Sequence, residues 1–143
     1  MQGLIYVLFS PHSFLGSEAD GRLAEAEGSS TSQLVLSTLV AHGATLLGTV
    51  ERESEELLWR FRVRLSDERI FVSIAWWLFD NLPRRSYWAV HFRGPIYLVS
   101  RRRGQTSVQT IAAIAETLAQ DLRSKDNIAE VRLFTYDEFN RLR

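Results

Sequence analysis

The stretch that decides the fold is LLWRFRVRL (57–65), SDER (66–69) and IFVSIAWWLF (70–79). In the first run, apolar side chains alternate with Arg60, Arg62 and Arg64. Successive side chains of a strand point to opposite faces, so this pattern predicts a strand with one buried face and one basic face. The second run is apolar at nearly every position, which predicts a strand covered on both faces. The polar residues between them predict a hairpin loop.

Further strands are predicted on either side of this hairpin. Short apolar or alternating runs occur at 4–9, 45–52, 86–93 and 128–134. Ser10-Pro11 is expected to end the first of these strands, because proline cannot donate a backbone hydrogen bond to a neighbouring strand. Gly94-Pro95 predicts a bulge or bend, after which residues 96–100 continue the same strand.

Two long helices and a short one are predicted from capping signals and helical spacing. Three pairs have capping-box spacing: Ser30 with Gln33, Thr106 with Gln109, and Thr135 with Glu138. The first helix is expected to stop at Gly43. The second is expected to run over 107–124, where apolar residues recur at helical spacing.

Between the first strand and the first helix lies an irregular segment, residues 12–30. It mixes glycine, serine and acidic residues, and predicts an ordered loop with a helical turn at 22–27. The resulting element order is β-α-β-β-β-β-α-β with a short C-terminal helix. This order predicts a single α+β domain over residues 1–143, a two-layer sandwich with a mainly antiparallel sheet.

Composition restricts the function classes. Lys+Arg and Asp+Glu both number 17, so a strongly basic nucleic-acid binder is not indicated, although a local basic patch stays open. There are no cysteines, which excludes disulfides and thiol chemistry and favours a cytoplasmic protein. The apolar run near the N-terminus is too short to span a bilayer, so no membrane association is expected.

No motif for catalysis, metal binding or a cofactor is present. The sequence lacks GxSxG, SxxK, GxGxxG and GxxxxGK[ST] patterns. His12, His42 and His91 do not have the spacing of metal ligands. We therefore expect no cofactor, no metal and no enzymatic activity. The alternative is an enzyme or ligand-binding domain with a pocket under residues 12–30 that uses His12 or His91.

The unusual feature is arginine interleaved with aromatic residues. Arginine, tryptophan and tyrosine dominate the hot spots of protein interfaces, and arginine with aromatics also forms platforms for single-stranded nucleic acid. Trp76 and Trp77 must point to opposite faces of their strand, so one of them is expected under a helix and the other either under residues 12–30 or exposed as an anchor. The predicted partner-binding residues are Arg60, Arg62, Arg64, Trp77, Arg84, Arg85, Arg101, Arg102 and Arg103.

From these features we expect a non-catalytic protein-binding domain. The size and character are those of a cytoplasmic bacterial immunity or inhibitor-type protein, which neutralises a partner such as a toxin by occlusion. A small secretion-chaperone-like binder is one alternative, and a nucleic-acid-binding domain that uses the arginines of residues 60–64 is another. An interpretation without a binding role also stays open, in which these arginines only form a solvated face paired with the glutamates of residues 51–56. Both a monomer and a homodimer fit the sequence.

Overall fold

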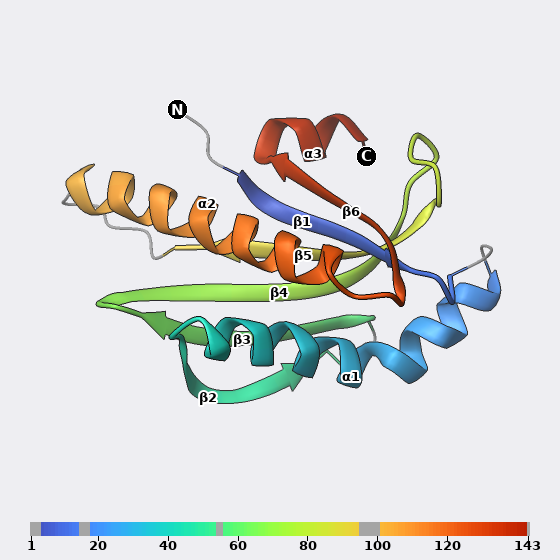
Figure 1. Ribbon diagram of the computed structural model, residues 1–143, viewed down its shortest axis with the longest axis horizontal. Coiled ribbons are helices and arrows are strands. Elements are labelled where there is room, and N and C mark those ends of the chain that lie inside the picture. The colour runs from blue at the N-terminus through green and yellow to red at the C-terminus, as the bar shows by residue number, and fades with distance from the viewer. Residues whose placement is uncertain (1–3, 15–17, 54–55, 95–100, 143) are drawn as a thin grey trace.

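The computed structural model describes residues 4–14, 18–53, 56–94 and 101–142, with backbone alone at residues 4, 18–20 and 101–107. Its centre is one antiparallel sheet in the order β2-β3-β4-β5-β1-β6 (Figure 1). The strands are β1 Leu4–Pro11, β2 Thr45–Arg52, β3 Leu58–Leu65, β4 Glu68–Leu78, β5 Ser86–Arg93 and β6 Ile128–Thr135. The helices are α1 Glu18–Ala41, α2 Arg101–Arg123 and α3 Tyr136–Leu142. The α+β class and the element order are confirmed.

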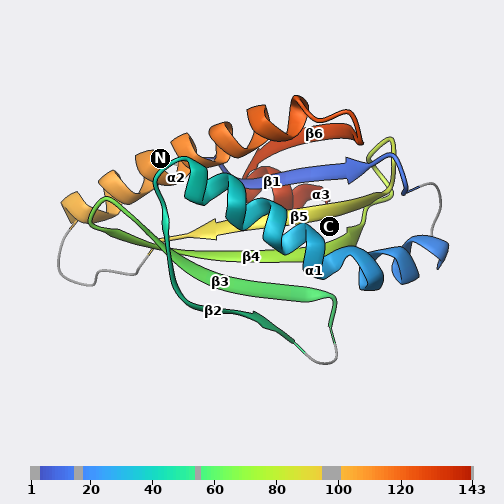
Figure 2. The same ribbon diagram turned by 60° about the horizontal axis from the view of Figure 1, so that its bottom comes forward.

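The main core lies between one face of the sheet and helices α1 and α2 (Figure 2). Alternation in β3 places Trp59, Phe61 and Val63 on this face, as the sequence pattern predicts. The ring of Trp59 meets that of Trp88 on β5 edge to face, with centroids 5.7 Å apart. Burial of these large side chains is the main source of stability.

A second, smaller core forms on the opposite face under α3. The ring of Phe139 stacks on Tyr6 of β1 at 3.8 Å and meets Phe79 edge to face at 5.8 Å. A capping box starts α3, as predicted: the backbone N–H of Thr135 donates to Oε1 of Glu138 at 2.9 Å, and the N–H of Glu138 donates to Oγ1 of Thr135 at 3.3 Å. The short terminal helix therefore adds a partial third layer that covers one end of this face.

The β3–β4 hairpin is confirmed, with a tighter turn than the four polar residues suggest. Leu65 pairs with Glu68, so the loop is two residues long. Ser66 adopts φ = 55°, as two-residue hairpin turns require. Because Glu68 and Arg69 belong to β4, the side chain of Arg69 falls opposite Arg64.

Helix α1 contradicts the predicted loop at 12–30. The helix begins at Glu18 and passes through Ser30 and Gln33, so that pair does not cap it. Serine and threonine are tolerated inside it because their hydroxyls return to the backbone of the preceding turn: Ser32 Oγ donates to Ser29 O at 2.8 Å and Thr38 Oγ1 to Leu34 O at 3.0 Å. The predicted stop at Gly43 is confirmed, with φ = 99°.

Helix α2 also begins earlier than expected. It starts at Arg101, so the three consecutive arginines form its first turn rather than a loop, and Thr106 with Gln109 lies inside the helix. The predicted continuation of the β5 strand over residues 96–100 lies outside the described residues. In the part of the chain that the structure describes, no helix is both long and apolar enough to cross a membrane.

The two neighbouring tryptophans of β4 lie on opposite faces, as predicted, but neither is an exposed anchor. Trp76 is half-buried against the main core beneath α1. Trp77 is half-buried in the second core, where its ring lies 6.2 Å from Phe79 and 5.9 Å from Phe139. The interpretation of Trp77 as an exposed anchor is wrong, because the C-terminal helix supplies a packing partner that periodicity within β4 does not reveal.

Trp77→Ala is expected to lower the free energy of unfolding by about 2 kcal/mol, because it removes a half-buried indole from the second core. Urea denaturation followed by circular dichroism measures the change. Unchanged stability would show that α3 does not depend on this contact. The exposed neighbour Leu78, in the same strand, provides the control: Leu78→Ala is expected to leave stability nearly unchanged.

Candidate binding surface on the sheet

The part of the sheet that no described helix covers is the second face of β2, β3, β4 and the adjoining end of β5, on the side away from α1 and α2 (Figure 2). Helix α3 reaches only the end of this face where Trp77 and Tyr6 lie. Side chains directly opposite each other on neighbouring strands share a face. The pairing of the strands therefore settles which residues this surface presents.

Three cross-strand rows make up the surface, which we call the arginine face. In the first row Arg64 lies opposite Arg69. In the second, Phe71 of β4 lies between Arg62 of β3 and Arg93 of β5. The third row, formed by Arg60, Ser73 and His91, lies two residues further along the strands.

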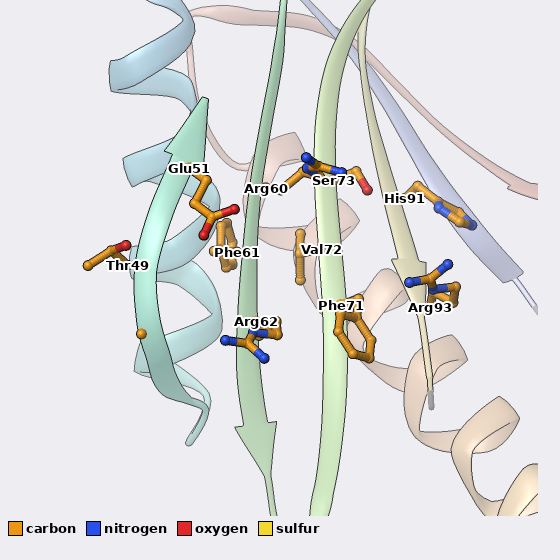
Figure 3. Close-up of a pocket in the computed structure, with 11 residues that line it drawn as sticks. Thr49, Glu51, Arg60, Phe61, Arg62, Phe71, Val72, Ser73, His91 and Arg93 are labelled. Atoms are coloured by element: carbon orange, nitrogen blue, oxygen red, sulfur yellow. The ribbon is translucent and has the colours of Figure 1, made fainter. Parts of the chain in front are cut away.

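A hollow of about 690 Å³ opens on this face. Figure 3 shows Arg62 and Arg93 on either side of Phe71, with Ser73 and His91 in the neighbouring row. The wall on the β2 side is formed where that strand loses its register between Leu47 and Glu51. Gly48 adopts φ = 82° there, a conformation that glycine adopts without strain. The irregular edge strand therefore forms one wall of the hollow.

Charge on the arginine face is only partly balanced. Arg60 forms an ion pair with Glu53. Within the described ranges, no carboxylate lies in ion-pair distance of Arg62, Arg64, Arg69 or Arg93. The guanidinium of Arg93 lies 5.1 Å from the centre of the Phe71 ring, a cation–π contact. A protein with equal numbers of acidic and basic residues thus gathers unpaired cations on one surface.

His91 borders the hollow as a neutral imidazole. Its ring stacks on Tyr6 at 4.5 Å. Burial lowers the pKa of His91 below its usual 6.5, and the positive charge of Arg93 lowers that pKa further. A neutral histidine keeps one N–H donor and one acceptor nitrogen, so it contributes a hydrogen bond without adding charge.

The low pKa of His91 predicts a pH dependence of stability. Well above pH 6.5 the imidazole is neutral in both the folded and the unfolded chain, so it does not change the free energy of unfolding with pH. As the pH falls below 6.5, the unfolded chain binds the proton first, so this residue makes the free energy of unfolding decrease. The decrease should be shallower in His91→Gln, measured by urea denaturation at a series of pH values. Equal slopes in both proteins would contradict the assignment.

Apart from Trp77, which packs in the second core, the predicted site residues divide into three groups. Arg60, Arg62 and Arg64 are exposed on one face of β3, as the alternation predicts. Arg101, Arg102 and Arg103 begin α2, at the same end of the sheet as the β3–β4 hairpin (Figure 1). Arg84 and Arg85 lie in the β4–β5 connection, seven or more residues along the strands from Phe71, or roughly 23 Å. The structure therefore does not bring the nine residues together.

Arg84 has a structural role inside the molecule. Its Nε donates to Ser10 Oγ at 3.0 Å, and its Nη2 donates to the carbonyl oxygens of Pro11 at 3.1 Å and Phe14 at 2.7 Å. These bonds hold the end of β1 against the β4–β5 connection. Arg85 is exposed and lies 3.7 Å from Asp80. Both residues are thus engaged within the chain.

Sequence reasoning missed the contribution of β4 to this surface. The sequence pattern places Arg69 in the hairpin loop, and residues 70–79 show too little alternation to say which face Phe71 and Ser73 occupy. A two-residue turn would have placed Arg69 opposite Arg64, but four polar residues in a row conceal where the strand resumes.

The alternative, an enzymatic or ligand-binding site that uses His12 or His91, has little support from the positions of these side chains. His12 and Glu27 line one hollow of about 490 Å³ beside α1. In the described ranges, however, no histidine forms an ion pair with a carboxylate, and no group of three potential metal ligands occurs. The pairing that would point to acid–base catalysis is therefore not formed there.

Comparison with known proteins adds no family and no relative to this description. No family model, no curated protein and no solved structure matches this chain.

Proposed function

We propose that this chain is a non-catalytic binding domain that holds an acidic protein partner against its arginine face. The observation that carries the proposal is a set of arginines for which the described residues supply no carboxylate partner, on a sheet face that no described helix covers. Within the proposal, this surface meets carboxylates of the partner, and Phe71 supplies apolar contact between Arg62 and Arg93.

The arrangement costs the free protein some stability. Arg64 and Arg69 lie directly opposite each other on paired strands, and like charges in that position are destabilising. A purely solvated surface would gain from opposite charges there, as the pairing of Arg60 with Glu53 illustrates. An anionic partner would remove the repulsion between Arg64 and Arg69. This favours a binding role for the face over that of a merely solvated surface.

Mixed charge at the border favours a protein over a nucleic acid. Glu51 lines the hollow, and Glu53 neutralises Arg60. A polyphosphate backbone would be repelled by these carboxylates, whereas a protein surface can meet both signs of charge. Phe71 alone is an aromatic platform for one base at most, while single-strand binders stack successive bases on several rings.

The finer proposal is an immunity or inhibitor-type protein of the bacterial cytoplasm. It would neutralise a toxin by covering the toxin's working surface, without turnover. Charge on the arginine face would speed association, and desolvated contacts around Phe71 would slow release. A basic catalytic or nucleic-acid-binding toxin would not suit this face, so the expected toxin surface is acidic.

Affinity purification of the tagged full chain from its native host, followed by mass spectrometry, tests the proposal. We expect one stoichiometric protein with an acidic surface, retained by the wild type and lost from a variant with reversed charges on the arginine face. Recovery of RNA that washes off at high salt would instead assign the face to nucleic acid. Retention of the protein by the charge-reversed variant would remove the arginine face from the interface.

A further inference from the structure

We propose that the hollow between Arg62 and Arg93 receives one carboxylate side chain of the partner, an aspartate or glutamate, as the anchor of the complex. This inference rests on the proposed function and deepens it, because it names the group that the centre of the arginine face recognises. It is carried by the placement of donors around Phe71, by the charge balance of the hollow and by its open shape.

The donors come from three neighbouring strands and surround Phe71. Arg62 and Arg93 lie on the two strands that flank Phe71, so their backbones are roughly 10 Å apart. Both long side chains can therefore reach a group held above the ring. Ser73, two residues along β4, adds a hydroxyl on the same face, and His91 opposite it on β5 lines the hollow with its ring stacked on Tyr6. A carboxylate offers acceptor positions to several such donors at once.

The charge balance matches a single negative charge. The hollow is lined by Arg60, Arg62 and Arg93, and against these stand Glu51 at the rim and Glu53 on Arg60. One positive charge remains, which one carboxylate neutralises. A phosphate dianion would overcompensate it and would face Glu51. The lowered pKa of His91 agrees with this count, since the imidazole adds no charge near neutral pH.

The shape of the hollow favours a side chain presented by a protein over a free metabolite. Small-molecule sites enclose most of their ligand's surface, whereas the described residues that line this hollow belong to four strands and to no helix. The partner itself would provide the missing cover. Exclusion of water by the partner would then strengthen each charge-assisted hydrogen bond.

The test titrates the isotopically labelled full chain with acetyl-glutamate-amide, a single side-chain carboxylate between blocked peptide groups. The backbone amide signals of Phe71, Ser73, His91 and Arg93 are followed by NMR at constant ionic strength. We expect saturable shifts of these signals, and no such shifts with acetyl-glutamine-amide, which has the same shape without the charge. Inorganic phosphate and a short oligothymidine are titrated in the same way and should bind about tenfold more weakly or not at all.

Two variants separate the hollow from the rest of the face. Ser73→Tyr fills the hollow without changing charge and should weaken the binding of acetyl-glutamate-amide at least about tenfold. Thr45→Tyr adds the same ring to an exposed position of β2, outside the hollow, and should leave binding unchanged. Circular dichroism confirms that both variants fold.

Each outcome decides the inference. Equal binding to wild type and Ser73→Tyr, or no saturable shift in the wild type, would overturn the anchor. The proposed function would still stand if charge reversal on the face abolished capture of the partner. If phosphate or oligothymidine binds more strongly than acetyl-glutamate-amide, the hollow binds a phosphate group and the carboxylate assignment is overturned.

Discussion

The double variant Arg62→Glu/Arg64→Glu should lose its partner, with affinity reduced at least about 100-fold, while the free protein stays folded. Two cations that have no carboxylate in ion-pair distance among the described residues become anions on the surface that we assign to an acidic partner. The free protein gains an attractive pair, because the new glutamate at position 64 lies opposite Arg69. Its free energy of unfolding should therefore equal or slightly exceed that of the wild type.

A matched variant controls for overall charge. Arg22→Glu/Arg123→Glu makes the same change in net charge at exposed positions on α1 and α2, which cover the opposite face. It should retain the partner. Binding is measured by surface plasmon resonance with the captured partner at two salt concentrations, and stability by urea denaturation. An equal loss of affinity in both double variants would show that only net charge matters. A loss of affinity caused by unfolding of the Arg62→Glu/Arg64→Glu variant would contradict the assignment of the arginine face to the partner.

The second large effect concerns two glycines of α1 that should respond to alanine with opposite signs. A Cβ atom on Gly28 would overlap the six-membered ring of Trp59, which is 4% exposed and packed against Trp88. Because neither ring has room to move, Gly28→Ala should lower the free energy of unfolding by about 2–3 kcal/mol, despite the better helix propensity of alanine.

Gly21→Ala is the matched control in the same helix. Its Cβ would lie 3.6 Å from Trp76, an ordinary contact distance. Here only the propensity gain remains, so this variant should be more stable by about 0.5 kcal/mol. Both are measured by urea denaturation with circular dichroism. Similar small effects at both positions would show that Trp59 does not pack against α1 as described.

These glycines also explain why the first helix was not predicted from its start. Residues 18–27 are rich in alanine and glutamate, which favour a helix, but Gly21, Gly28 and the serines at 29–32 are typical of loops. The structure retains Gly28 inside the helix because a tryptophan thirty-one positions later fills the space of its side chain. No local pattern contains that contact.

The strands were predictable because their cause is local. Alternation in β3 is a property of neighbouring residues, and it correctly separated Trp59, Phe61 and Val63 from the three arginines between them. The capping box of Thr135 and Glu138 was predictable for the same reason, since both partners lie within one turn. Local chemistry thus determined the α+β class and where most strands begin and end.

The sequence by itself therefore determined the elements of this protein and the basic stripe on β3. Only the tertiary structure decided which residues lie beside these arginines. Strand register placed Arg69, Phe71 and Arg93 next to them, and α3 packed on Trp77 and left the arginines uncovered. Register and helix docking depend on contacts between residues far apart in the chain. Those contacts form because the two faces of the sheet are buried at the same time by distant parts of the chain, so the sequence of one segment does not predict them.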